Sequence, residues 1–259
     1  MDIQKEFCTN NSRYKSGQTI KPEGAVLHSI GCPQPDARVL QRSWQNNASP
    51  YVTHYVLDDV RIIHTMPDNR KCWHVGTPGN NKWIGIEMCE PKQIKYTGGS
   101  TFTVKDRDAA RAYCKKTYAN AVQLLAKLCK QYGWTPYTAI LTHCEITKKK
   151  LSKTDHVDPE HLWNGLGLNY TLDTLRRDVA AAMGGSVKPE SNANAAPSAS
   201  YLARITASVL NVRKGPGINF DIATNVMRNE VYTIVEEKDG WGKLKSGAGW
   251  INLSYTKRV

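Results

Sequence analysis

Short apolar runs rich in β-branched residues recur along the first part of the chain and predict strands. These runs are AVLHSI (25–30), THYVLDD (53–59), RIIHTM (61–66), WIGIEMC (83–89) and TAILTH (138–143). None approaches the roughly 18 apolar residues that a membrane-spanning helix needs, so we expect no membrane insertion.

Segments with helical periodicity lie around these strands. From Asp106 to Tyr132, apolar residues recur at three- or four-residue steps, and Gly133 is suited to end that helix. The apolar positions are Cys114, Tyr118, Ala121, Leu125, Leu128 and Tyr132. A second helix is predicted from Thr171, a candidate N-cap, to Gly184. A shorter one follows CPQPD and carries Val39, Leu40 and Trp44. Strands and helices in this order predict an α/β domain with a mixed central sheet and flanking helices.

The pattern changes after residue 183. Residues 184–201 are rich in Gly, Ser, Ala, Asn and Pro and predict a flexible linker. Residues 202–259 contain short alternating runs broken by Gly, Pro and Asp-Gly, without a helical pattern, and predict a small all-β barrel. The expected organisation is therefore a larger domain (1–183), a linker (184–201) and a small domain (202–259).

Composition narrows the range of partners. The formal net charge of the 259 residues is +12, and basic residues are spread over both predicted domains. Such a surface suits a polyanion, whether nucleic acid, anionic lipid or an anionic cell-wall polymer. No nucleic-acid-binding motif accompanies the charge, so we expect no nucleic-acid partner. The oligomeric state is left open.

Seven cysteines all precede residue 145, and their odd number argues against a disulfide framework. We expect them to be reduced and mostly buried. The N-terminal MDIQKEFCTNNSRYK is polar and carries acidic residues early, unlike a secretory signal. The expected site of synthesis is therefore the cytoplasm.

Histidines at two strand ends are candidate metal ligands. His28 and His143 each end an apolar run, and neighbouring strands bring such ends to one edge of a sheet. A third ligand must come from the following segment, where the candidates are Cys144, Glu145, Asp155, His156, Asp158 and His161. On an extended chain, Cys144 and Glu145 would point away from His143, whereas His156 and Asp158 share a side and Pro159 stiffens the next turn. Nitrogen and oxygen donors with an open position suit catalytic zinc, and no Cys-x-x-Cys pair suggests a structural one.

An acidic residue inside an apolar strand is the candidate proton acceptor. Glu87 is flanked by Ile84, Ile86 and Met88, which is costly unless its carboxyl group faces a polar cleft. The alternative is a solvent-facing position on an edge strand. Glu90, near the strand end, is expected to be solvated.

Six motifs in order, VLHSIGCPQPDA, THYVLDD, CWHVG, IGIEMCE, LTHCEI and DHVDPEHLW, resemble zinc-dependent N-acetylmuramoyl-L-alanine amidases of the phage-lysozyme and peptidoglycan-recognition-protein type. The resemblance covers most of residues 20–165. It implies a zinc ion (Zn2+) bound by His28, His143 and Asp158, and Glu87 as the catalytic glutamate. His156 stands where many relatives have a lysine that stabilises the transition state. The implied substrate is bacterial peptidoglycan.

The same resemblance implies pocket positions for His54, Trp73 and His74, with core packing an alternative for Trp73. His64 and His161 are interpreted as surface or packing residues. Residues 203–259 resemble bacterial SH3 domains through ASVLNVRKGPGINF, VYTIVEEKDGWGKL and GWINLSY, which implies binding to the cell wall. Trp241 and Tyr255 are the candidate wall-binding aromatics, whereas Trp250 is expected in the core.

Three biological roles are compatible with these observations. The first is a phage or prophage endolysin, made in the host cytoplasm and acting on the wall after release. The second is a bacterial autolysin with the same chemistry. The third is a non-catalytic peptidoglycan-recognition protein, against which the presence of both Asp158 and Glu87 argues. Met183 is also a candidate internal start for a free wall-binding domain.

Overall fold

The computed structural model describes residues 2–46, 51–152, 154–184, 200–217, 220–238 and 240–259. The chain divides into two compact units, residues 1–187 and 188–259, and each is described by itself. The predicted linker, 184–201, spans this division, but its residues 185–199 lie outside the described residues. No described helix is long and apolar enough to cross a membrane.

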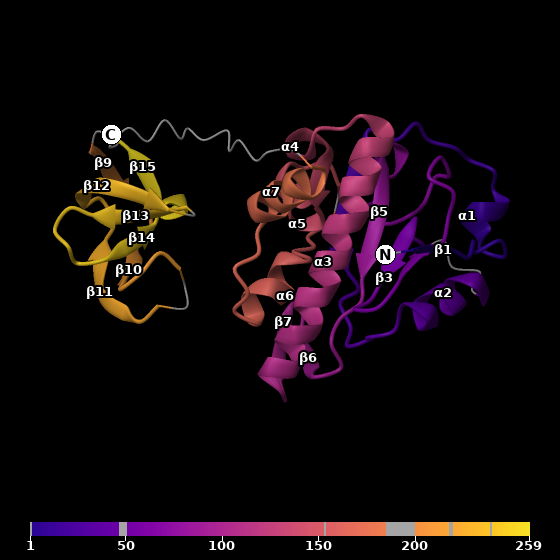
Figure 1. Cartoon of the computed structure of the whole chain (residues 1–259), viewed down its shortest axis with the longest axis horizontal. Coiled ribbons are helices and arrows are strands. Elements are labelled where there is room, and N and C mark those ends of the chain that lie inside the picture. The colour runs from indigo at the N-terminus through magenta and orange to yellow at the C-terminus, as the bar shows by residue number, and fades with distance from the viewer. Residues whose placement is uncertain (1, 47–50, 153, 185–199, 218–219, 239) are drawn as a thin grey trace. The chain divides into compact units, whose positions relative to one another are not determined.

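A mixed sheet forms the centre of the first unit, with helix α3 (Arg107–Tyr132) in front of it in Figure 1. It has six strands in the order β1-β4-β3-β5-β2-β8. The strands are β1 (Ile3–Lys5), β2 (Gly24–Ser29), β3 (Tyr55–Leu57), β4 (Ile62–His64), β5 (Trp83–Met88) and β8 (Ile140–Thr142). β3, β5, β2 and β8 run parallel to one another, and β4 is antiparallel to β3. Every apolar run predicted as a strand contains one, and the α/β fold class is confirmed.

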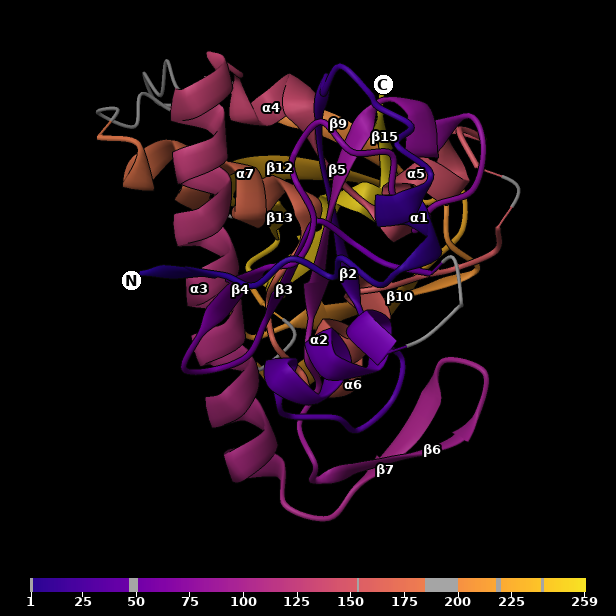
Figure 2. The same cartoon turned by 90° about the vertical axis from the view of Figure 1, so that its right-hand side faces the viewer.

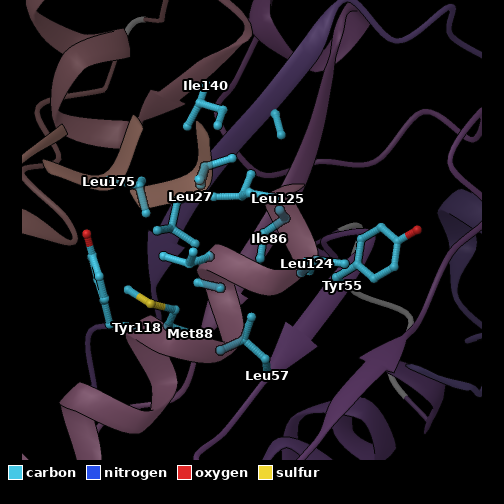
Figure 3. Packing of buried hydrophobic residues seen from close by; sticks show 14 of the residues in the cluster. Leu27, Tyr55, Leu57, Ile86, Met88, Tyr118, Leu124, Leu125, Ile140 and Leu175 are labelled. Atoms are coloured by element: carbon cyan, nitrogen blue, oxygen red, sulfur yellow. The ribbon is translucent and has the colours of Figure 1, made fainter. Parts of the chain in front are cut away.

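Helix α3 (Arg107–Tyr132) covers one face of this sheet and begins and ends as predicted. The Asp106 side chain accepts a hydrogen bond from the Ala109 amide, and Gly133 adopts the left-handed conformation at the C-cap, with φ 67°. Figure 3 shows Leu124 and Leu125 of this helix packed near Leu27 and Ile86 of the sheet. This packing places the main hydrophobic core between α3 and the sheet.

The remaining helices surround the sheet on both sides. Helix α7 (Leu172–Ala182) joins the α3 side and begins at the predicted N-cap, Thr171, which forms a capping box with Thr174. Helix α2 (Ala37–Asn46) covers the opposite face, where Trp44 is buried. The short elements are α1 (Ser12–Lys15), η1 (Gly79–Asn81), α4 (Pro136–Ala139), α5 (His143–Lys148) and α6 (Glu160–Gly165).

A two-stranded hairpin, β6 (Ile94–Gly98) and β7 (Thr101–Val104), stands apart from the central sheet (Figure 2). Tyr96 pairs with Phe102 across its strands, and the Phe102 ring lies so close to Gly165 of α6 that no side chain fits there. The aromatic pair therefore anchors the hairpin to α6.

The second unit is an all-antiparallel seven-stranded sheet in the order β11-β10-β14-β13-β12-β9-β15. Its elements are β9 (Tyr201–Ile205), β10 (Val209–Arg213), β11 (Ile222–Met227), β12 (Val231–Lys238), β13 (Trp241–Leu244), β14 (Trp250–Asn252), η2 (Leu253–Tyr255) and β15 (Thr256–Arg258). Trp250 is buried as expected. Trp241 is only 8% exposed and Tyr255 is 51% exposed, so only Tyr255 of the two candidate wall-binding aromatics is accessible.

Candidate active site

Three site residues lie in one row across adjacent parallel strands. His28 of β2 is paired in register with Glu87 of β5, and Leu27 is paired with Thr142 of β8. His143 follows Thr142 directly, so the row continues from Glu87 through His28 to His143. Because side chains alternate across a strand, His28 lies on the face opposite Leu27, away from the α3 core. The row lies near the carboxyl ends of these strands, where open α/β sheets place their sites.

Asp158 completes a buried cluster with the two histidines. The Nδ1 atoms of His28 and His143 are 3.0 Å apart. The carboxylate of Asp158 lies 3.3 Å from His28 Nδ1 and 3.2 Å from His143 Nδ1. Tetrahedral coordination with bonds of about 2.0–2.1 Å separates neighbouring ligand atoms by roughly 3.3 Å. Among the described residues, this donor set therefore fits a four-coordinate metal ion with one open position.

The protonation states of His28 and Asp158 suit metal binding. Burial lowers the pKa of His28 to about 4, against the opposing effect of its contact with Asp158. Burial disfavours an ionised Asp158, but its contacts with His143 and His28 prevail and hold its pKa well below the usual range. A neutral imidazole and an ionised carboxylate are the forms that coordinate a metal.

His143 is the first residue of α5, so the prediction that the chain runs extended through Cys144 and Glu145 was wrong. The Thr142 hydroxyl accepts a hydrogen bond from the Glu145 amide and starts the helix at that point. Cys144 and Glu145 are still absent from the cluster. The Cys144 amide donates to the backbone carbonyl of Asp158 at 3.0 Å, which ties the third residue of the cluster to the helix. Cys144 is one of six buried free cysteines, and Cys32 alone is exposed.

Glu87 occupies a central strand, which excludes the alternative of an edge position. β5 lies between β3 and β2, and the Glu87 side chain lines the site cavity although the residue is only 8% exposed. Burial, followed by the charges of Asp158 and Glu90, raises the pKa of Glu87 well above its ordinary value. A carboxyl group with a raised pKa is suited to exchange protons near neutral pH.

Glu90 is fully buried, so the expectation that it is solvated was wrong. Its carboxylate accepts hydrogen bonds from the Gly31 amide at 3.0 Å and from the Tyr96 hydroxyl at 2.8 Å. Burial raises its pKa to about 7, against these hydrogen bonds. The Tyr96 oxygen also lies 2.7 Å from His161 Nε2. His161 therefore packs in a hydrogen-bonded wall of the site, consistent with its interpretation as a packing residue, and it also lines the cavity.

The predicted pocket residues divide into two kinds. Trp73 and His74 line the site cavity, and the Arg13 guanidinium stacks over the Trp73 ring at 4.3 Å. His54 is fully buried and absent from the lining. Its Nδ1 accepts the Gly85 amide at 2.9 Å and its Nε2 lies 2.8 Å from the Arg70 carbonyl. Both nitrogens are used by the backbone, so the prediction that His54 touches substrate was wrong.

His156 lies at the mouth of the cluster rather than within it. Its side chain is 59% exposed, and its Nδ1 is 3.7 Å from Asp158 Oδ1. Its ring centroid is 4.5 Å from that of His143. It is thus placed beside two residues of the cluster with an accessible imidazole.

A cavity of about 690 Å³ opens above this row. The sequence did not predict part of its wall. These lining residues are Tyr96, Gly99 and Ser100 from the β6–β7 hairpin, and Trp44, Tyr51, Val52 and Thr53. The hairpin had a detectable signal, since IKYTGGSTFTV alternates about a Gly-Gly-Ser turn. Trp44 and Tyr51 carry no comparable local pattern.

Comparison with known proteins supports the architecture. The sequence profile of the N-acetylmuramoyl-L-alanine amidase family matches residues 18–161, and that of the bacterial SH3 domain matches residues 208–257. The N-acetylmuramoyl-L-alanine amidase CwlA of Bacillus subtilis is 31% identical over 131 residues, covering 48% of this chain and 42% of the relative. The bifunctional autolysin of Staphylococcus aureus is 26% identical over 183 residues, covering 67% of this chain and 13% of the relative. The chain thus spans less than half the length of these curated relatives.

Solved structures agree on the fold. The crystal structure of the Staphylococcus aureus hydrolase AmiA in complex with its ligand superposes with a TM-score of 0.53 at 24% identity, covering 71% of this chain and 83% of that one. The solution structure of the PlyG catalytic domain gives a TM-score of 0.52 at 20% identity, covering 73% of this chain and 99% of that one. With a family match over more than half of its length, the chain belongs to the N-acetylmuramoyl-L-alanine amidase family and carries a bacterial SH3 domain after the amidase domain.

Proposed function

We propose that this chain hydrolyses the amide bond between N-acetylmuramic acid and L-alanine in peptidoglycan, with a zinc ion held by His28, His143 and Asp158. The observation that carries the proposal is the buried His-His-Asp cluster at the floor of an open cavity, with Glu87 in the same row. Non-catalytic binding of peptidoglycan would need neither a complete donor set nor a buried carboxyl group beside it.

The residues divide the chemistry between them. When bound, zinc acts as a Lewis acid that polarises the amide carbonyl and lowers the pKa of water. Glu87 accepts the proton of the attacking water and passes it to the nitrogen of the leaving L-alanine amine. Trp73 and the hairpin residue Tyr96 both line the cavity, and they would exclude solvent from the bound substrate. His156 directs an N–H group at the oxygen that becomes negative in the transition state.

Analysis of the cleavage products tests this proposal directly. We expect digestion of purified peptidoglycan to create new L-alanine amino termini, detected by mass spectrometry, and the active protein to contain one zinc per chain. New reducing sugars would instead identify a glycosidase. Zinc-free protein that binds the wall without releasing fragments would identify a recognition protein.

The His156 role predicts a moderate loss on substitution. We expect His156→Ala to lower kcat by about 10²-fold, the typical effect of removing one oxyanion donor, while zinc content stays at the wild-type level. His156→Lys restores a donor and should recover most of that loss. Turnover at the wild-type rate in His156→Ala would exclude the role, and loss of zinc would assign His156 to metal binding.

The second unit supplies attachment to the wall in this proposal. The amidase domain (1–183), linker (184–201) and SH3 domain (202–259) would act together, because a bound SH3 domain raises the effective concentration of the amidase domain at its polymer. Tyr255 is the accessible aromatic residue of the predicted pair and the position at which we would first test wall binding.

For the biological role, we propose an endolysin that lyses the host cell from within. A bacterial autolysin is the second candidate, which the similarity to the Staphylococcus aureus bifunctional autolysin favours. Deletion of the gene distinguishes them. Failure of lysis at the end of a phage cycle identifies an endolysin, whereas chains of unseparated cells identify an autolysin.

A further inference from the structure

The outer nitrogen of His28, on the side away from Asp158, contacts another histidine. His28 Nε2 lies 3.0 Å from Nδ1 of His74, and His74 Nε2 lies 3.1 Å from the backbone carbonyl of Trp83. These contacts form one continuous line from a backbone carbonyl, through two imidazole rings, to the donor atom of the proposed zinc ligand.

The backbone carbonyl of Trp83 at the end of this line fixes the direction of each hydrogen bond in it. A carbonyl oxygen can only accept, so His74 must carry its proton on Nε2. A neutral imidazole has one N–H, so with that proton on Nε2 the neutral His74 ring offers a lone pair at Nδ1. The His74 Nδ1 is therefore an acceptor, and His28 must donate to it from Nε2. This leaves His28 Nδ1 as an unprotonated lone pair facing Asp158 and His143.

The position of the His74 ring is fixed by its surroundings. A methyl group added at Gly85 of β5 would lie 2.6 Å from His74 Cγ, so the ring occupies the space that a side chain would fill. Asn80 Oδ1 accepts hydrogen bonds from the backbone amides of His74 and Val75, each at 3.0 Å. The ring of His54 packs edge-on against it at 6.0 Å. The segment is thus built to hold one orientation of this ring.

We propose that His74 is a positioning residue that fixes the Nε2–H tautomer of His28 and so presents Nδ1 to the metal. This inference rests on the proposed zinc site and gives His74 a role other than substrate contact. His143 has no equivalent constraint, because its Nε2 meets the Thr154 hydroxyl at 2.9 Å, and a hydroxyl can donate or accept.

Zinc affinity in three variants tests the proposal. His74→Phe keeps a ring but has no acceptor, and we expect it to bind zinc about 10- to 100-fold more weakly in competition with a chelator, the usual effect of losing an outer partner of a metal ligand. His74→Gln can accept from His28 with its amide oxygen and donate to Trp83 with its nitrogen, so its affinity should return close to the wild-type value. His64→Gln is the matched control, because His64 lies outside the cavity lining and is paired with Asp68, and it should leave the zinc affinity unchanged.

The tautomer itself gives a second readout that a purely structural role would not change. Nitrogen-15 NMR of the full-length zinc-free protein should show the His28 proton on Nε2 in the wild type. In His74→Phe it should show a mixture of the two neutral tautomers, with the proton on either Nε2 or Nδ1. Wild-type zinc affinity in His74→Phe, or a His28 proton on Nδ1 in the wild-type protein, would overturn the proposal. If His74→Phe does not fold, the wild-type spectrum and the zinc affinity of His74→Gln still test the proposal. Neither measurement uses peptidoglycan, so a chain that passes both tests but cleaves no amide would refute only the proposed function.

Discussion

Asp158→Ala should lose bound zinc and amide hydrolysis together. Asp158 is the only anionic residue of the cluster, and its carboxylate faces the Nδ1 atoms of both histidines. Mutating an outer partner of a metal ligand already weakens metal binding by about 10- to 100-fold. Losing a ligand itself should therefore weaken zinc binding by about 100-fold or more. Hydrolysis should fall to background, because water is no longer activated.

The fold should survive this substitution. Alanine keeps the backbone carbonyl that accepts the Cys144 amide, and it also removes a buried charge when the metal is absent. We would measure zinc by elemental analysis after dialysis, hydrolysis by release of peptide from purified walls, and folding by thermal melting. Asp173→Ala is the control, since Asp173 is an exposed carboxylate on α7. Full zinc occupancy in Asp158→Ala would remove Asp158 from the ligand set.

Glu87→Gln should keep zinc but lose hydrolysis. The two side chains have nearly the same shape, and the ligand set does not include Glu87. An amide cannot accept the proton of the attacking water, so kcat should fall by about 10²- to 10⁴-fold, the range for a general acid–base residue. KM should change little, because the cavity keeps its shape.

The pH profile supplies an independent check of the same residue. Glu87 must be ionised to accept a proton, and burial raises its pKa. The kcat/KM of the wild type should therefore rise with pH through a value above the ordinary range of a glutamate, and Glu87→Gln should lack this limb. Glu23→Gln, at an exposed ion pair with Lys82, is the control. Residual turnover above about one tenth of the wild-type rate would contradict the assignment.

Local sequence signals predicted the elements whose ends are determined locally. Asp106 and Gly133 bound α3, and Thr171 begins α7, because their side chains or backbone angles satisfy the helix termini themselves. His28 and His143 could be brought together from strand ends alone, because parallel strands place equivalent positions side by side. Glu87 was singled out separately, as an acidic residue inside an apolar strand. The third ligand was narrowed to His156 or Asp158 by spacing and assigned to Asp158 through the family resemblance.

The errors concern residues whose surroundings come from distant segments. Glu90 is buried because the β6–β7 hairpin and the Gly31 amide cover it, and neither contact is visible from the charge pattern around Glu90. His54 is removed from the cavity because Gly85 and Arg70 use both of its nitrogens. Such placements depend on tertiary packing, whereas periodicity reports only which face of one element is apolar.

The three residues of the cluster come from parts of the fold that differ in local stability. His28 lies within a buried central strand and His143 directly follows β8, whereas Asp158 comes from an irregular segment, where its carbonyl accepts the Cys144 amide and its carboxylate accepts the Ser29 amide. Opening that segment requires far less free energy than unfolding the sheet, because few backbone hydrogen bonds break. A metal ion could therefore leave and return by local opening at Asp158 while both histidines stay in place. The lifetime of the bound metal would then report the stability of one short loop and not that of the whole domain.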